Sequence, residues 1–248
     1  MSVSLTLFIS DLHLQPERDD ITQAFEYFLN NQAQKADVLY ILGDFFEVWI
    51  GDDDDAPFNQ QITQLLQQYT AQGKLLYLMV GNRDFLMGDA FATQCGATLL
   101  TDPTTIDLYG TPTLLMHGDS LCTSDTEYMA FRQQARSQVW QQALLSTTLD
   151  ERRTISRQLR DQSKSMSSMK AEDIMDVTPE AVQAEMQTAK VIRMIHGHTH
   201  RPAIHKVELA DNQNSAQRMV LGDWDSKIWW IEASENQPPT LKQLDFPT

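Results

Sequence analysis

The sequence is poor in cysteine and in basic residues, and it has no long apolar run. Its 248 residues include two cysteines, Cys95 and Cys122, and 19 basic against 34 acidic side chains, which gives a net charge of −15. Two distant cysteines make neither a disulfide framework nor a zinc knuckle, and they indicate a reducing compartment.

A nucleic-acid partner is not expected, because proteins that bind nucleic acids usually carry a basic excess. A membrane span needs about 20 apolar residues, and the first residues lack the basic segment of a signal peptide. We therefore expect a cytoplasmic protein.

The acidic side chains are unevenly distributed. Residues 1–119 hold 17 acidic and 4 basic side chains, whereas the stretch 150–170 holds six basic and three acidic ones. The run Asp52–Asp55 lacks the spacing and the glycine of an EF-hand loop. We expect this run to be a solvated, self-repelling loop.

Short apolar runs alternate with helical patterns in the first half. The pattern predicts strands at 5–9, 38–42 and 75–80, helices at 21–34, 58–72 and 85–94, and a hairpin around 109–112. Strand patterns return at 191–195, 203–209, 219–221 and 228–231, and the alternation indicates an α/β fold. Between them lies a polar, helical stretch, and glycine is absent from Asp119 to His196. We interpret 1–120 and 190–248 as a core and 121–189 as a helical cap.

Five polar clusters each follow an apolar, strand-like run. They are Asp11-Leu-His13, Gly43-Asp44, Gly81-Asn-Arg-Asp84, His117-Gly-Asp119 and His196-Gly-His-Thr-His200. In an α/β sheet the carboxyl ends of the strands share an edge, so these side chains should converge. Oxygen and imidazole donors without thiolate suit Mn²⁺, Fe²⁺ or Zn²⁺. Each cluster alone could be a turn or a packed histidine, but the series predicts a two-metal site in which Asp44 bridges the ions.

The order of these clusters resembles the calcineurin-like metallophosphoesterase superfamily, whose pattern is D-x-H, G-D, G-N-[HR]-D, a later H, and G-H-x-H. Longer runs resemble one family within it, the UDP-2,3-diacylglucosamine pyrophosphohydrolases of the lipid A pathway. They are Tyr40–Asp44, Trp49–Asp53, Gly81–Phe85, Met116–Asp119, Ile174–Val177 and Ile195–Pro202. The resemblance implies an α/β fold with a β-sandwich core flanked by helices, and a cap, 121–189, that forms the lipid-substrate site.

The resemblance also implies a metal centre and a reaction. Carried over by position, one Mn²⁺ would be held by Asp11, His13, Asp44 and His200, and a second by Asp44, Asn82, His117 and His198. The implied enzyme is a diphosphatase that splits the pyrophosphate of UDP-2,3-diacylglucosamine into UMP and 2,3-diacylglucosamine 1-phosphate (lipid X). A water activated by the two metals would attack the α-phosphorus.

The same resemblance implies which residues contact the substrate. They are Asn82, Arg83, Asp125, Ser163, Ser167, Lys170 and His198. Many members of the superfamily have histidine where Arg83 stands; a fixed cation suits a leaving group that is itself a phosphate. An acylated substrate further implies peripheral contact with the cytoplasmic face of the inner membrane.

Two alternatives remain open at this stage. One is a metallophosphoesterase of another specificity, for phosphoproteins, cyclic nucleotides or dinucleotides, which would not need a large methionine-containing insertion. The other is a scaffold that has lost its metals, but then the ligand set should be broken, and all seven metal positions hold competent donors.

Overall fold

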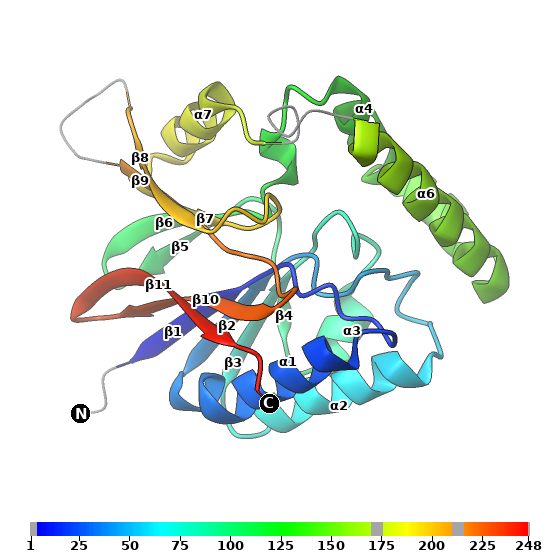
Figure 1. The fold of residues 1–248 in the computed structure, drawn as a ribbon, viewed down its shortest axis with the longest axis horizontal. Helices are drawn as coiled ribbons and strands as arrows, with labels where there is room; N and C mark the ends of the chain where they lie inside the picture. Colours follow the sequence, from blue (N-terminus) through cyan, green and yellow to red (C-terminus); the bar gives the residue numbers. More distant parts are fainter. Residues whose placement is uncertain (1–3, 170–175, 210–215, 248) are drawn as a thin grey trace.

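The computed structural model describes residues 4–169, 176–209 and 216–247, the side chains of 162–169 excepted. Two β-sheets lie face to face between layers of helices (Figure 1). One sheet has six strands in the order β11-β10-β1-β2-β3-β4, and the other has five in the order β5-β6-β7-β9-β8. The mixed α/β architecture confirms the expected fold class.

The six-stranded sheet is parallel through its central strands. It contains β1 (Leu5–Ile9), β2 (Val38–Leu42), β3 (Leu75–Met79), β4 (Thr98–Leu99), β10 (Lys227–Ser234) and β11 (Gln237–Asp245). Strands β1 to β4 pair in parallel, and β10 pairs antiparallel with β1 and β11. Parallel strands are buried on both faces, which explains why β2 is a continuous apolar run and why β1 is apolar except at Thr6.

Alternation along these strands divides their side chains between two cores. On β1, Leu7 and Ile9 pack with the helices α1 (Asp19–Asn31), α2 (Pro57–Thr70) and α3 (Asp89–Gln94). Phe8 points to the opposite face and joins Leu115 and Ile195 of the second sheet. Because successive residues of a strand face opposite ways, one short strand contributes to both cores.

The five-stranded sheet carries the second half of the site. It contains β5 (Thr104–Leu108), β6 (Thr111–Leu115), β7 (Arg193–His196), β8 (Ala203–Val207) and β9 (Ala216–Val220). Strands β6, β7 and β9 are parallel, and β5 and β8 pair antiparallel at the edges. The predicted hairpin is confirmed as β5–β6. The outer face packs against α7 (Pro179–Ala189), with Met194 touching the cluster that holds Val182 and Met186.

Helices fill the stretch between β6 and β7. They are the 3₁₀ turn η2 (Asp119–Leu121), α4 (Thr126–Ala135), α5 (Gln138–Leu145), α6 (Leu149–Met169) and α7. In Figure 1, α6 runs along the side of the molecule, beyond the ends of the strands, whereas α7 covers the second sheet.

Some predicted bounds were wrong. The helix predicted at 85–94 begins at Asp89, because Gly88 is extended and the Asp52 carboxylate accepts hydrogen bonds from the N–H groups of Gly88 and Phe91, which starts the helix there. Strands β4 and β11 were not predicted.

Candidate functional site

The polar clusters meet where the two sheets bring their strand ends together. Asp11 follows β1, and its backbone N–H donates to the carbonyl of Gly43, which follows β2. From the other sheet, the N–H of His198 donates to both Asp11 carboxylate oxygens, at 3.0 and 2.9 Å. The N–H of Gly197 donates to the carbonyl of His117. Hydrogen bonds therefore hold the loops of both sheets in one site.

Two groups of metal-binding side chains form within this site. In one, donor atoms of Asp11, His13 and His200 lie within 4.8 Å of one another, and in the other those of Asp44, His117 and His198 do so.

Asp44 lies between the two groups. One carboxylate oxygen is 3.9 Å from Nε2 of His13, and the other is 3.6 Å from Nε2 of His117. The Asn82 side-chain oxygen is 3.0 Å from the same His117 nitrogen. All seven predicted metal residues thus come together, with Asp44 between the groups as the pattern predicted.

Most of these residues have an unusual backbone conformation. Asp11, His13, Asp44, His198 and His200 have φ between 48° and 67°. Residues other than glycine rarely adopt this left-handed conformation, which costs about 1–2 kcal/mol each. Five such residues in one site indicate that the fold holds them there against local preference.

Two glycines allow the chain to pack tightly at the same place. A Cβ on Gly81 would collide with the Asp44 carboxylate, and one on Gly197 would collide with that of Asp11. The Gly-Asn and Gly-His motifs therefore need glycine so that the carboxylates can fit.

The second ring nitrogen of three histidines faces an oxygen outside the predicted set. Nδ1 of His117 is 2.9 Å from the Leu42 carbonyl, and Nδ1 of His200 is 3.6 Å from the Asp223 carboxylate. Nδ1 of His13 is 2.8 Å from the Glu47 carboxylate. Metal-binding histidines commonly donate their other N–H to such an oxygen, which fixes the ring and the tautomer. Sequence analysis missed Glu47 and Asp223, since no motif marks them.

Charges in the site shift the histidine pKa values in opposite directions. Burial lowers the pKa of His117, but Asp44 and Asp11 outweigh it and raise this pKa to about 9. Burial also opposes the rise for His200, yet the hydrogen bond and charge of Asp11 raise its pKa to about 9. Burial lowers the pKa of His198 to about 4. The carboxylates thus make this buried site attractive to positive charge.

The donor set fits divalent cations. Carboxylate, amide and imidazole donors converge from both sheets, and the Asp44 carboxylate faces both groups. The second ring nitrogen of three of the histidines faces a protein oxygen. Harder and borderline ions such as Mn²⁺ or Zn²⁺ suit such donors. The part of the chain that the structure describes therefore contains two groups of side chains that could each hold a divalent cation.

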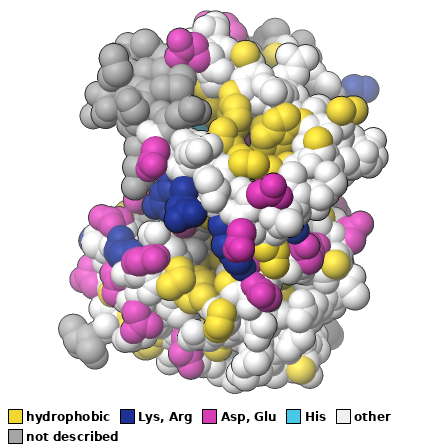
Figure 2. Space-filling view, turned by 90° about the vertical axis from the view of Figure 1, so that its right-hand side faces the viewer, with side chains coloured by type: hydrophobic (Ala, Val, Ile, Leu, Met, Phe, Trp, Pro, Cys, Tyr) yellow, Lys and Arg dark blue, Asp and Glu magenta, His cyan; other side chains and the backbone are white. Residues whose placement is uncertain are grey.

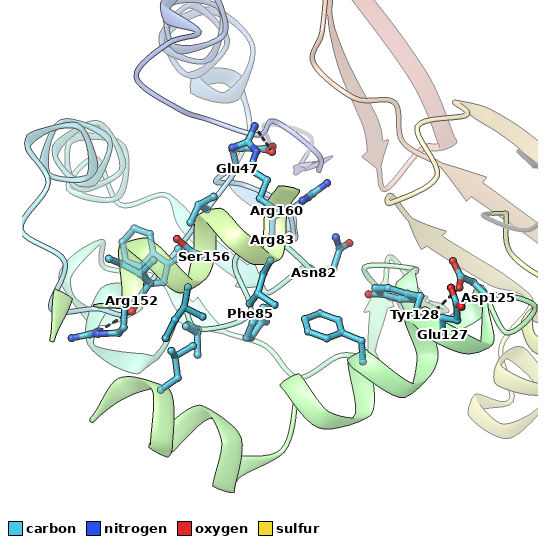
Figure 3. Close-up of a pocket in the computed structure, with 18 residues that line it drawn as sticks. Glu47, Asn82, Arg83, Phe85, Asp125, Glu127, Tyr128, Arg152, Ser156 and Arg160 are labelled. Carbon is cyan, nitrogen blue, oxygen red and sulfur yellow. Dashed lines mark hydrogen bonds and ion pairs between the residues drawn. The ribbon is translucent and has the colours of Figure 1, made fainter. Parts of the chain in front are cut away.

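An apolar cavity of about 210 Å³ adjoins the metal centre. Figure 3 shows that Asn82 and Arg83 line it from the core side, while Tyr128 and Arg160 reach it from the cap helices. Its apolar lining comes from both parts: Val48, Trp49, Ile50, Phe85, Leu86, Phe131, Leu144, Ile155 and Leu159. The Tyr128 ring stacks near that of His198, with 6.2 Å between centroids, so the cavity begins beside the metal groups.

The predicted substrate residues are only partly placed by the structure. Arg83 lines the cavity, and its guanidinium makes no hydrogen bond or ion pair with any described residue. Asp125 also lines the cavity and caps α4 by accepting from the N–H of Tyr128. Ser163 and Ser167 fall where side chains are not described, and Lys170 lies outside the described residues.

The expectation of a self-repelling loop at Asp52–Asp55 was wrong, although Asp53 and Asp55 are exposed, at 62% and 73%. Asp53 forms an ion pair with Arg152, and both Asp54 and Asp55 pair with Arg153 of α6. The acidic run does not repel itself into solvent, because arginines about 100 positions later in the chain neutralise it.

Helix α4 packs beside the proposed metal ligands through one buried carboxylate, that of Asp119. Asp119 accepts hydrogen bonds from the Tyr128 hydroxyl at 2.6 Å and from Nε of Arg132 at 2.8 Å. Burial opposes the ionised form, but His117 and neighbouring charges outweigh it and hold the pKa of Asp119 well below its usual range. Asp119 therefore remains ionised and holds α4.

Comparisons with known proteins agree with this geometry. The profile of the family described as calcineurin-like phosphoesterase matches residues 5–202. UDP-2,3-diacylglucosamine hydrolase of Marinobacter nauticus is 55% identical over 96% of this chain and 96% of the relative. The proteins of the same name from Cellvibrio japonicus and Pseudomonas aeruginosa are 52% and 53% identical, over 92% and 97% of this chain and 95% and 98% of the relatives.

Proposed function

The chain belongs to the calcineurin-like phosphoesterases and, within them, to the UDP-2,3-diacylglucosamine hydrolases, and from this premise we propose that it hydrolyses UDP-2,3-diacylglucosamine. The products are UMP and 2,3-diacylglucosamine 1-phosphate. The observation that carries the proposal is the apolar cavity that opens beside two groups of metal ligands, with Asn82 and Arg83 on its wall. A phosphoesterase for small polar substrates needs the ligands but not this cavity.

We propose that the centre holds two Mn²⁺ ions. Asp11, His13 and His200 would bind one ion, His117, His198 and Asn82 the other, and Asp44 both. Two divalent ions supply an activated water and neutralise phosphate oxygens during such a hydrolysis. This assignment is supported by the position of Asp44, whose two carboxylate oxygens face one group each.

The polar residues beside the centre would orient the pyrophosphate. The Arg83 side chain forms no hydrogen bond or ion pair with a described residue, although its charge helps to lower the pKa of Glu47. Its guanidinium is therefore available to bind the leaving phosphate through two N–H groups. Its backbone is fixed, since its N–H donates to Asp44 at 2.8 Å. Arg83 would thus stabilise negative charge as it moves to the leaving group, and a phosphate leaving group needs no proton donor.

The cavity would hold an acyl chain. Each methylene moved from water to an apolar wall contributes about 0.8 kcal/mol, so acyl binding supplies affinity that the pyrophosphate cannot. We propose that residues 121–189 act as the cap over the core formed by 1–120 and 190–248. Asp125, Ser163, Ser167 and Lys170 would contact the polar part of the substrate.

A membrane surface is the proposed source of this acylated substrate. None of the described helices has the length and apolar character to cross a bilayer. On α5, however, Val139 is 80% exposed and Leu145 is 40% exposed. The side of the molecule seen in Figure 2 carries hydrophobic side chains, with both basic and acidic side chains among them. We propose that this face touches the cytoplasmic surface of the inner membrane transiently; Val139→Glu should weaken co-sedimentation with anionic vesicles.

The deciding experiment is UMP release from UDP-2,3-diacylglucosamine by the purified chain, with Mn²⁺ and after chelation. We expect release that depends on the metal and is lost in Asp44→Asn. Hydrolysis of a generic aryl phosphodiester without UMP release would instead favour a phosphoesterase of another specificity.

A further inference from the structure

The apolar cavity ends at a buried arginine. In Figure 3, Arg152 lies at the opposite end of the lining residues from Tyr128 and Asp125. Its side chain is only 3% exposed, although arginine is rarely buried to this extent. The largely apolar cavity that begins beside the proposed metal ligands thus has a positively charged residue at its far end.

Three interactions hold this guanidinium in place. Nη1 donates to the Ile50 carbonyl at 2.7 Å and to Oδ1 of Asp53 at 2.6 Å, and Nη2 donates to Oδ2 of Asp53 at 2.5 Å. Nε is buried and has no hydrogen-bond partner in the described part of the chain. A bidentate pair fixes both the position and the plane of arginine.

The backbone beside the Arg152 guanidinium leaves room for it because residue 51 is a glycine. Gly51 has φ of 130°, and a Cβ there would collide with Nη1 of Arg152 and lie 2.8 Å from the Leu145 side chain. The loop at Gly51 therefore lies so close to α5 and α6 that there is no space for even one methyl group on this glycine. At this end of the cavity, Arg152 is therefore in tight contact with the backbone of Gly51.

A purely stabilising role explains this arrangement poorly. Buried ion pairs are weak contributors to stability, because desolvation offsets their attraction. The neighbouring Arg153 is 39% exposed and pairs with Asp54 and Asp55, so α6 could be attached to the core without a charge inside the cavity.

We propose that Arg152, pinned by Asp53, is the end wall that sets the longest acyl chain the cavity accepts. The proposal rests on the proposed function and deepens it. A chain that reaches the guanidinium would have to displace a bidentate ion pair, which hydrocarbon cannot replace. Arg152 acts here as a specificity-determining residue and takes no part in the chemistry.

The expected signature is a sharp optimum of chain length. Below the limit, each buried methylene should raise kcat/KM by about fourfold, and beyond it kcat/KM should fall. In Arg152→Ala the optimum should move to longer chains, and kcat/KM for a substrate two carbons beyond the wild-type optimum should rise by about tenfold relative to short substrates.

The test measures UMP release by the metal-loaded protein from a series of UDP-2,3-diacylglucosamines whose acyl chains lengthen stepwise. Arg153→Ala is the matched control, since it removes a neighbouring pair between α6 and the acidic run but does not line the cavity; its optimum should stay at the wild-type length. Asp53→Ala should shift the optimum in the same direction as Arg152→Ala, because it frees the arginine. Asp53 is 62% exposed, so Arg152→Ala leaves no buried charge without a partner. Asp53→Ala leaves the Arg152 guanidinium with the Ile50 carbonyl as its acceptor among the described residues, so Arg152→Ala is the primary test.

The outcomes separate the two proposals. If wild type releases no UMP at any chain length, the proposed function fails. If wild type is active but Arg152→Ala keeps the wild-type optimum, the end-wall proposal is overturned. Should Arg152→Ala not fold, Arg152→Met decides the question: its flexible, uncharged side chain is not pinned, so the optimum must still lengthen.

Discussion

Glu47 links a proposed metal ligand to the cap, and Glu47→Gln tests that link. One carboxylate oxygen is 2.8 Å from Nδ1 of His13, and the other is 2.8 Å from Nη2 of Arg160 on α6. Burial raises the pKa of Glu47, but the adjacent His13 ring and the charges of Arg83 and Arg160 together outweigh it and lower this pKa below its ordinary value. The side chain is therefore an ionised acceptor with one oxygen for each of two donors.

The size of the effect follows from this one-to-one match. Glutamine has the same shape but only one acceptor oxygen, so its NH₂ group must face either His13 or Arg160. In both orientations His13 loses the negative charge that makes its ring a better ligand. Such partners of metal-binding histidines typically contribute 10–100-fold to metal affinity, which corresponds to about 1.4–2.7 kcal/mol. We expect the affinity for Mn²⁺ to fall by this amount in Glu47→Gln.

The assay is calorimetric titration of the metal-free protein with Mn²⁺, without substrate. Arg160→Gln is the matched control: it breaks the other half of the bridge, keeps Glu47 on His13, and should leave Mn²⁺ affinity within about twofold of wild type. Glu26→Gln, on the exposed face of α1, controls for charge alone. Affinity in Glu47→Gln within threefold of wild type would refute the reasoning.

Four further predictions follow from the same geometry. Arg83→Ala should lower kcat/KM for UMP release by about 100-fold, as loss of a charge-stabilising donor does elsewhere; a change of only a few-fold would exclude the assigned role. Tyr128→Phe should lower the free energy of unfolding in urea by about 1.5–3 kcal/mol, because it removes a buried hydrogen bond to ionised Asp119, whereas Tyr27→Phe should change it by under about 0.5 kcal/mol. Chelation should lower Tm by about 5–10 °C in a thermal-shift assay if the metal is present at about 100 times its Kd, and an unchanged Tm would contradict metal binding to the folded state. Burial raises the pKa of Cys95 and Cys122 to about 12, so both thiols should resist an aromatic disulfide reagent at pH 8 until the chain is unfolded, and rapid native labelling would show that they are accessible.

The sequence predicted which polar side chains come together, because each motif directly follows the end of a strand. Asp11 and Asp44 follow strands β1 and β2, whose apolar runs are unmistakable, and parallel pairing then brings the two loops together. The edge strand β11 escaped prediction, since it contains Pro238 and Pro239 and shows no alternation. Proline is tolerated at a sheet edge, and β11 is the outermost strand of its sheet.

The residues that support the site could not be predicted in the same way. Glu47 and Asp223 are single carboxylates in loops, and only the folded chain shows that they face His13 and His200. The apolar cavity is likewise assembled from core and cap residues far apart in the sequence. Sequence motifs identify the proposed metal ligands. The carboxylates that contact those ligands, Glu47 and Asp223, come close to them only through long-range packing.

The uneven charge of the chain has a structural cause in the docking of the cap. Acidic side chains of the first half bind arginines of α4 and α6 at three separate places: Asp53 to Arg152, Glu47 to Arg160, and Asp119 to Arg132. Each pair also touches the proposed site. Arg152 lines the far end of the cavity, and Glu47 contacts His13. Asp119 binds Tyr128, whose ring stacks near that of His198. Pairs of this kind fix orientation more than they add stability. The excess of acid in residues 1–119 therefore does two things: it supplies carboxylates to the two groups that could hold cations, and it pairs with arginines of the helices that line the apolar cavity.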